Sequence, residues 1–403
     1  MAPTRPKNKN KQGRQGKKSI PLDVVLQEAT AILHSGDPQK ALLVAKKVLE
    51  RTGTGGDFEL PALNLLGLVC IELGETEDAR TYLLQAADLD EGGSLDEKVG
   101  GGPEKFLWLA QLSEEGGSDS VRWFAKGAAA LRTQIDHLSN GDSRPSRTRR
   151  AGGGDQDGAL TALEEKRREL AGVLCAMAEV YMTDLSWEAD AEQRCEALVT
   201  EATMTCPESA ETWQTVANVR ISQQRADDAK AALRRSLEIW QDLPPEDVRV
   251  PDFAARVSLA RLLMEVDMTT EAMQVLERLV TDDDTSVETW YLGGWCQFIQ
   301  GEKARGASSS GSNGTGRAAS EEPAWKAAWA AGRQWLVRCL KLYKLQEYED
   351  ERLGEHAHEL VQSINGELGA LPADEDDDGD EWEDAEEDDE EDEDEDEDAD
   401  MVA

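Results

Sequence analysis

The chain has 403 residues and a net charge of −40 at neutral pH, a length that allows two or three ordinary domains or one long repeat array. The acidity argues against nucleic acid as the main ligand, because phosphate binding needs Lys and Arg gathered on one face, and it favours basic proteins instead. No apolar stretch approaches the roughly 18 residues of a membrane span, and six scattered cysteines without a C-x-x-C pair predict buried thiols rather than disulfides or a zinc site.

The first twenty residues form a basic arm. Residues 1–20 hold seven Lys or Arg and no acidic residue. They lack the apolar core of a secretory signal, so we expect the protein to stay inside the cell. The run from Lys7 to Lys18 is either a nuclear-import signal or a plain disordered arm, and the sequence leaves both interpretations open.

The middle of the chain, residues 21–370, is predicted to be an all-α repeat array. Residues 63–91 fit the tetratricopeptide pattern, in which small residues let two antiparallel helices approach and large ones fill the groove between them. Further copies recur near 25–48, 213–236, 259–279 and from Trp290, and two degenerate copies lie near 103–135 and 174–207. The second degenerate copy carries an insertion of about five residues. We therefore predict an α-solenoid of about seven tetratricopeptide-type helix pairs.

Two Gly- and Ser-rich stretches, near 138–158 and 301–321, interrupt the array and are predicted to be flexible loops. Helical character resumes at Glu322, with three tryptophans on one stripe, and a more polar helix near 348–368 is expected to cap the array. Residues 371–403 form an acidic tail, in which 23 of the 27 positions from Asp374 to Asp400 are Asp or Glu. Charge this dense cannot belong to a folded core, so we predict a solvated, disordered tail.

The first helix of each pair lines the concave surface of such an array, and its inward slots are the candidate partner-binding residues. Acid, amide and aromatic side chains alternate there, a mixture that suits an extended basic segment. For any one aromatic residue, the alternative is that it completes the core between neighbouring repeats. The candidates are Asn64, Glu72, Phe106, Glu114, Glu179, Asn218, Met264, Glu265, Tyr291 and Trp295.

Catalysis has little support in the sequence. No nucleophile, base or metal-ligand constellation has usable spacing, and no phosphate-binding glycine motif follows a strand, so we expect neither an enzyme nor a cofactor. The pair His356 and His358 faces different directions on a helix and is expected to be a solvated part of the cap rather than a metal site.

Basic arm, repeat array and acidic tail together resemble the fungal dedicated assembly chaperones of ribosomal protein L-four of the large subunit. The likeness covers nearly the whole chain and lies in the segments Leu66–Gly74, Glu211–Trp213 and Trp290–Trp295 and in the opening of the tail at Asp374. It implies a chaperone that binds the long basic loop of the newly made ribosomal protein, keeps it soluble and releases it to pre-ribosomal RNA. We also expect no direct nucleic-acid or membrane partner, a monomer before client binding, and a location in cytoplasm and nucleus.

Three other functions agree with part of this pattern. A heat-shock co-chaperone needs cations where the inner slots here hold acids. A histone chaperone of tetratricopeptide type fits the charge pattern nearly as well, since histones are also basic and nuclear. A general peptide-binding scaffold would not need the tail.

Overall fold

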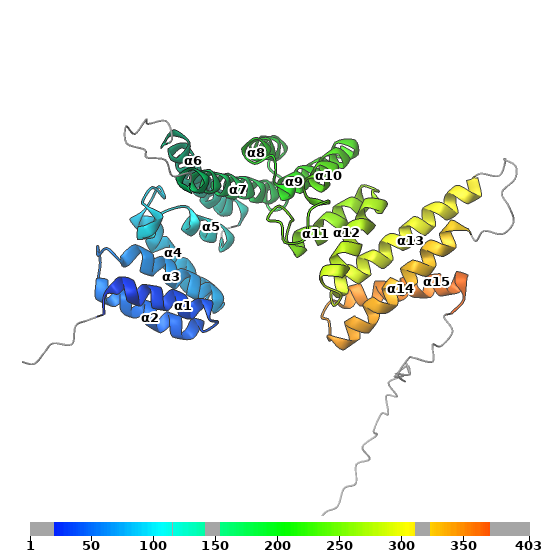
Figure 1. Cartoon of the computed structure of the whole chain (residues 1–403), viewed down its shortest axis with the longest axis horizontal. Coiled ribbons are helices and arrows are strands. Elements are labelled where there is room, and N and C mark those ends of the chain that lie inside the picture. Colours follow the sequence, from blue (N-terminus) through cyan, green and yellow to red (C-terminus); the bar gives the residue numbers. More distant parts are fainter. Residues whose placement is uncertain (1–19, 115, 142–153, 311–322, 371–403) are drawn as a thin grey trace, which may run out of the picture. The chain divides into compact units, whose positions relative to one another are not determined.

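The computed structural model describes residues 20–114, 116–141, 154–310 and 323–370, and these are helical throughout apart from turns and connections (Figure 1). The chain divides into two compact units, Met1–Asp284 and Thr285–Ala403. The basic arm up to residue 19 and the acidic tail from residue 371 lie outside the described residues. The predicted all-α repeat fold is confirmed.

The first unit contains six helix pairs. They are α1 (Leu22–His34) with α2 (Pro38–Thr52), α3 (Glu59–Glu72) with α4 (Thr76–Leu89), α5 (Glu104–Gln111) with α6 (Gly117–Gly141), α7 (Gly154–Met182) with α8 (Ala191–Thr205), α9 (Ala210–Ser222) with α10 (Ala226–Trp240), and α11 (Phe253–Glu265) with α12 (Thr269–Asp282). A short 3-10 helix, η1 (Glu97–Val99), lies between α4 and α5.

Four of these pairs close through the same three-residue turn. In each, the middle residue has a positive φ, at Gly36 (82°), Gly74 (73°), Gln224 (61°) and Asp267 (72°). The amide of the next residue then donates to a carbonyl five residues earlier, as from Glu75 to Cys70 at 2.8 Å. This left-handed cap satisfies carbonyls that the helix end leaves unpaired, and glycine adopts it without steric cost. These four pairs therefore share one way of joining their two helices.

The α7–α8 pair departs from this pattern. Its connection runs from residue 183 to residue 190, eight residues against three in the four regular turns. The predicted insertion of about five residues is therefore present, and it lies between the two helices as expected.

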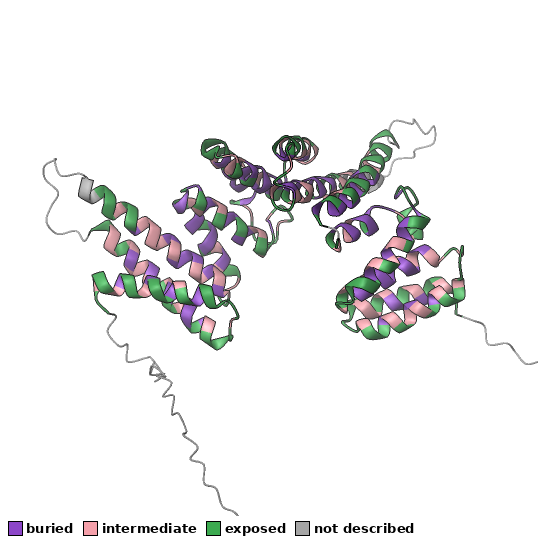
Figure 2. Ribbon diagram, turned by 180° about the vertical axis from the view of Figure 1, so that it is seen from behind, coloured by how far each residue is buried: buried purple, intermediate pink, exposed green. Residues whose placement is uncertain are grey.

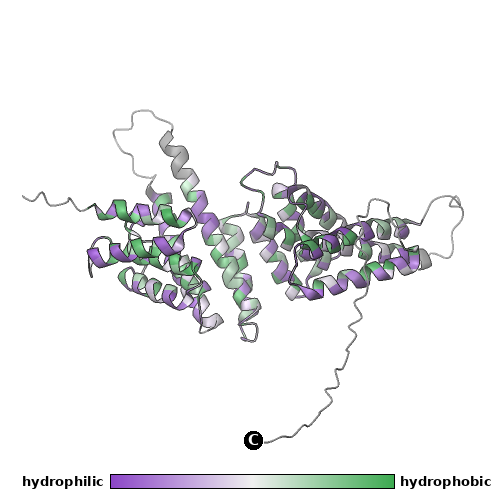
Figure 3. Ribbon diagram, turned by 90° about the horizontal axis from the view of Figure 1, so that it is seen from below, coloured by the Kyte–Doolittle hydropathy of each residue, from purple (hydrophilic) through white to green (hydrophobic). Residues whose placement is uncertain are grey.

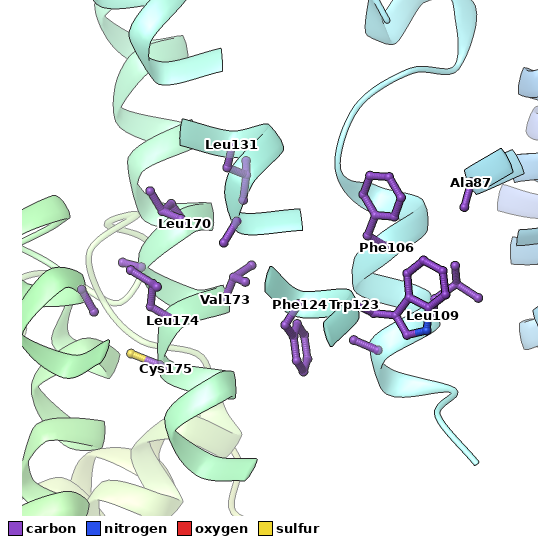
Figure 4. Close-up of a cluster of buried hydrophobic side chains, with 14 of the residues drawn as sticks. Ala87, Phe106, Leu109, Trp123, Phe124, Leu131, Leu170, Val173, Leu174 and Cys175 are labelled. Atoms are coloured by element: carbon purple, nitrogen blue, oxygen red, sulfur yellow. The ribbon is translucent and has the colours of Figure 1, made fainter. Parts of the chain in front are cut away.

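The α3–α4 pair packs through a small residue on its first helix. A Cβ on Gly67 of α3 would lie 2.6 Å from Leu83 of α4, so a side chain here would force Leu83 or the helices to shift. Buried residues form the facing stripes of the helices and exposed residues the opposite ones (Figure 2). A larger apolar cluster joins α4, α5, α6 and α7 (Figure 4), in which Phe106 stacks on Trp123 with ring centroids 6.2 Å apart.

The second unit contains α13 (Val287–Ser310), α14 (Ala324–Leu345) and α15 (Glu351–Leu368), whose helices carry both hydrophilic and hydrophobic residues (Figure 3). Glycines bring α13 and α14 close together, since a Cβ on Gly301 would lie 2.2 Å from Trp329. Trp329 also stacks on Phe298, with ring centroids 5.2 Å apart and planes 4° apart. The predicted tryptophan stripe thus packs α14 on α13, and α15 buries Leu353, Leu360 and Ile364 against them as the capping helix.

Both predicted loops are shorter than expected. Helix α6 continues to Gly141, α7 already begins at Gly154, and α13 extends to Ser310. The prediction of loop at 138–141, 154–158 and 301–310 was therefore wrong. Extending a helix already nucleated by packing costs little, so even residues of moderate propensity join it. Residues 142–153 and 311–322 lie outside the described part of the chain.

Candidate functional site

Three first helices of the first unit, α7, α9 and α11, lie side by side in chain order. They carry four of the predicted residues, namely Glu179, Asn218, Met264 and Glu265. The side chains of Glu179, Asn218 and Glu265 are exposed, and Met264 is half-buried. We call these four residues, with the exposed Arg261, the α7–α9–α11 surface. It combines carboxylate, amide and thioether groups within one unit.

Glu179 is the residue of this surface whose electrostatics stand out. Although its side chain keeps contact with water, partial desolvation raises the pKa of its carboxyl group. Water screens a partly desolvated carboxylate less than a fully hydrated one. A cation placed beside it is therefore attracted more strongly. Glu179 therefore remains a candidate contact for a Lys or Arg of a partner.

The inserted connection between α7 and α8 adds a feature that the sequence prediction missed. Its Trp187 is 78% exposed, and the indole Nε1 donates to the carbonyl of Asp184 at 3.0 Å. Beside this connection lies a hollow of about 380 Å³, lined by residues of α7, α8 and the end of α9, including Met182, Glu192 and Ser222. Ser186, the neighbour of Trp187 in the chain, lines this hollow, and exposed tryptophans are frequent anchors of protein interfaces. The signal was available, because the insertion places a tryptophan in a polar stretch.

Three predicted residues lie elsewhere than expected. Phe106 is fully buried against Trp123, so the interpretation of this residue as a surface contact was wrong. Asn64 donates from Nδ2 to the carbonyl of Gly100 at 2.6 Å, which shows that the connection 90–103 lies against α3 here. Glu114 is exposed but follows α5, which ends at Gln111, and therefore does not lie on a first helix. Glu72, at the end of α3, is exposed.

A buried ion pair fixes that connection. Lys105 donates to Asp90 Oδ2 at 2.8 Å and to the carbonyl of Gly102 at 2.7 Å, while Asp90 Oδ1 accepts from the amides of Ser94 and Leu95. Burial alone would raise the pKa of Asp90, but these contacts bring it below its ordinary value. Burial lowers the pKa of Lys105, and Asp90 only partly offsets this. The pair ties both ends of the connection to the core.

The two aromatic candidates belong to the second unit. Tyr291 and Trp295 are half-buried and pack against His356 of α15, whose Nδ1 lies 2.6 Å from the Tyr291 hydroxyl. The alternative that such aromatics complete the core fits both. His356 is half-buried in this cluster, so the expectation of a solvated histidine pair was wrong for His356, whereas His358 is exposed.

The acidity is unevenly divided between the units. Residues 21–284 contain 49 acidic and 27 basic residues, whereas residues 285–373 contain 11 and 9. Within the described residues, no cluster of His, Cys, Asp or Glu could hold a metal ion. The same residues contain no helix long and apolar enough to cross a membrane. The electrostatic field of the folded part thus originates in the unit that carries the α7–α9–α11 surface.

Comparison with known proteins assigns the chain to a family. Residues 60–92 match the tetratricopeptide repeat family. A protein of Emericella nidulans named "Probable assembly chaperone of rpl4" is 45% identical over 368 residues, which cover 89% of this chain and 87% of the relative. The chain belongs to the family of assembly chaperones of Rpl4.

Two further relatives of this Rpl4-chaperone family extend the comparison. A Schizosaccharomyces pombe protein of the same name is 32% identical over 365 residues, 90% of this chain and 96% of the relative. A solved structure entitled "Assembly Chaperone of RpL4 (Acl4) (Residues 1-338)" is 56% identical, with a TM-score of 0.65, and covers 72% of this chain and all of that one. The family resemblance that the sequence indicated is confirmed.

Proposed function

We propose that this protein is a dedicated chaperone of ribosomal protein L4 of the large subunit and binds a basic, extended segment of that client. The observation that carries the proposal is the concentration of acidic charge in residues 21–284, together with the exposed Glu179 and Glu265 on neighbouring first helices. The names of the relatives supply the client.

The physical role of the chaperone is to mask cationic charge. A free segment rich in Lys and Arg binds RNA without selectivity, because phosphate neutralisation dominates its affinity. Carboxylates on a curved helical surface occupy the same cations until a stronger polyanion competes. Release to pre-ribosomal RNA then needs no ATP, and the affinity for the client falls as salt rises. The role is binding and not catalysis.

The remaining parts of the proposal concern the termini and the cell. The basic arm directs the complex into the nucleus, and the acidic tail speeds capture of the client and repels stray RNA. The chaperone is a monomer until it binds its client, acts in cytoplasm and nucleus, and contacts neither membrane nor nucleic acid directly.

A matched pair of variants tests the binding surface. The double variant Glu179→Lys and Glu265→Lys reverses two charges on first helices, and the control Glu77→Lys and Glu277→Lys makes the same change at exposed acids of second helices. An exposed ion pair contributes about 0.5 kcal/mol and reversal counts it twice, so two reversals weaken client binding by about 2 kcal/mol, roughly 30-fold. The control pair should change the affinity far less.

The measurement is titration of purified client into each full-length variant, with circular dichroism to check helicity. Equal losses in both double variants would show that charge alone, and not this surface, holds the client. The client itself is identified by capture from lysate, where near-equal amounts of ribosomal protein L4 support the proposal. Core histones in its place would overturn it.

A further inference from the structure

Helix α14 is an exception in an acidic chain. Its 22 residues contain five Lys or Arg and no acidic residue. The basic residues are Lys326, Arg333, Arg338, Lys341 and Lys344. A purely basic helix in a protein of net charge −40 calls for a partner of negative charge.

Part of this charge lies on an outward stripe together with aliphatic groups. Val337 is 42% exposed and Leu345 is 77% exposed, and Lys341 between them is also exposed. Arg338 is half-buried on the same side, because residues three, four and seven apart share one face of a helix. Leu336 and Cys339 occupy the opposite, buried side. We call Val337, Arg338, Lys341 and Leu345 the α14 stripe.

The two cations of the stripe have no ion-pair partner in the described part of the chain. Neither Arg338 nor Lys341 forms an ion pair there, whereas Arg305 of α13 contacts Glu367 at 3.1 Å. Two cations beside two exposed aliphatic side chains suit a ligand that is both acidic and partly apolar.

The end of α15 is held against the same helix. The Arg333 Nη1 group donates to the carbonyl of Gly369 at 2.7 Å and to Asn365 Oδ1 at 3.0 Å. The acidic tail therefore begins a few residues from a point fixed on α14. Within the tail, the sequence Asp380-Glu-Trp382-Glu-Asp384 places one tryptophan among four acids.

We propose that the α14 stripe is the docking surface for the chain's own acidic tail. Trp382 covers the exposed side chain of Leu345 at the end of the stripe. The flanking carboxylates pair with Arg338 and Lys341. This contact goes beyond client binding, since it gives the tail a fixed place on the second unit and keeps the cationic stripe from other polyanions.

The length of the tail fits this contact. Twelve residues of α14 separate Arg333 from Leu345, a distance of about 18 Å at 1.5 Å per residue. Thirteen residues separate Gly369 from Trp382. An uncharged flexible linker of that length has a root-mean-square span of about 20 Å, and the repulsion between its acids extends this one further, so it reaches Leu345. Short tethers that reach their site give effective concentrations of the order of 1 mM. Docking in the same molecule therefore needs only a weak contact.

RNA is the competing ligand for a basic stripe. It offers phosphate but no aliphatic partner for Leu345, and the net charge of −40 opposes its approach. The tail offers acid and tryptophan together and is already attached.

The test is lysine acetylation of the full-length chain, followed residue by residue with mass spectrometry at low salt. Lys341 is compared in the full chain, in a chain ending at Leu371, and in Trp382→Ala, which leaves the charge of the tail unchanged. The exposed Lys47 of α2 is the control. None of these changes touches the folded helices.

If the isolated contact has a Kd of about 0.5 mM, an effective concentration of about 1 mM keeps the tail docked two-thirds of the time and slows acetylation of Lys341 about threefold. We expect this protection to be lost on truncation and reduced by Trp382→Ala, with Lys47 unchanged throughout. Equal rates in the full and truncated chains would overturn the proposal. Equal slowing of Lys47, or protection of Lys341 that appears only with added polyuridine RNA, would also overturn it.

Discussion

The buried pair of Lys105 and Asp90 allows a quantitative prediction. Lys105→Met keeps the length of the side-chain stem but leaves Asp90 buried without its cation, in a place where both side chains are about 98% shielded from water. Removing one partner of a buried ion pair costs about 3–5 kcal/mol. Asp90 retains the amides of Ser94 and Leu95 as donors, so we expect the lower end of that range.

The assay is urea unfolding followed by far-ultraviolet circular dichroism. A loss of about 3 kcal/mol lowers the unfolding midpoint by about 1 M or more for usual urea dependences. Amide hydrogen exchange should show that the connection 90–103 loses protection first, because the pair holds both of its ends. Lys98→Met, an exposed lysine in the same connection, should change stability by less than about 0.5 kcal/mol.

Two further measurements test the role of the Lys105–Asp90 pair. Adding Asp90→Asn to Lys105→Met removes the unpaired charge but keeps an acceptor for the two amides, so it should recover part of the loss. A cost below about 1 kcal/mol for Lys105→Met alone would refute the assignment of the pair as the anchor of the connection. Because the pKa of Asp90 is lowered on folding, its stabilising contribution is present above about pH 4, the unfolded pKa, and is lost as pH falls through the lower folded pKa.

Three further predictions concern packing, thiol reactivity and the client. Gly301→Ala should lower the melting temperature, because its Cβ would lie 2.2 Å from a tryptophan ring of α14, whereas Gly306→Ala, with nothing within 4 Å, should raise stability by about 0.5–1 kcal/mol. Burial raises the pKa of Cys339 to about 12, so iodoacetamide at pH 8 should alkylate the half-buried Cys206 well before Cys339, and equal native rates would contradict the described burial. Trp187→Ala should weaken client affinity by about 2 kcal/mol, roughly 30-fold in titration, without moving the melting temperature, and a drop in melting temperature instead would mark a packing role.

The repeat pattern predicted the helix pairs because each regular copy repeats the same contacts. Small residues such as Gly67 and Ala217 recur at close approaches, and that periodicity can be read without coordinates. The insertion between α7 and α8 was visible for the same reason, since it breaks a constant spacing.

The inner surface was harder to predict where the repeats degenerate. Helix α5 has eight residues, so the slot that the repeat pattern assigned to Phe106 turns into the core shared by α4, α6 and α7. Asn64 was predicted to bind a partner because of its position in the repeat pattern alone. In the structure, its side chain instead holds the carbonyl of Gly100, which is distant in the sequence. Such contacts between distant segments leave no periodic trace in the sequence.

The spacing of α7, α9 and α11 determines how long a client segment this acidic surface can contact. Packed helices lie about 8–10 Å apart, so the distance from α7 to α11 is about 16–20 Å. An extended chain covers that distance with about five or six residues. These three helices thus provide a surface for about six extended residues. In a series of client peptides of increasing length, the affinity should rise up to about six residues and then level off.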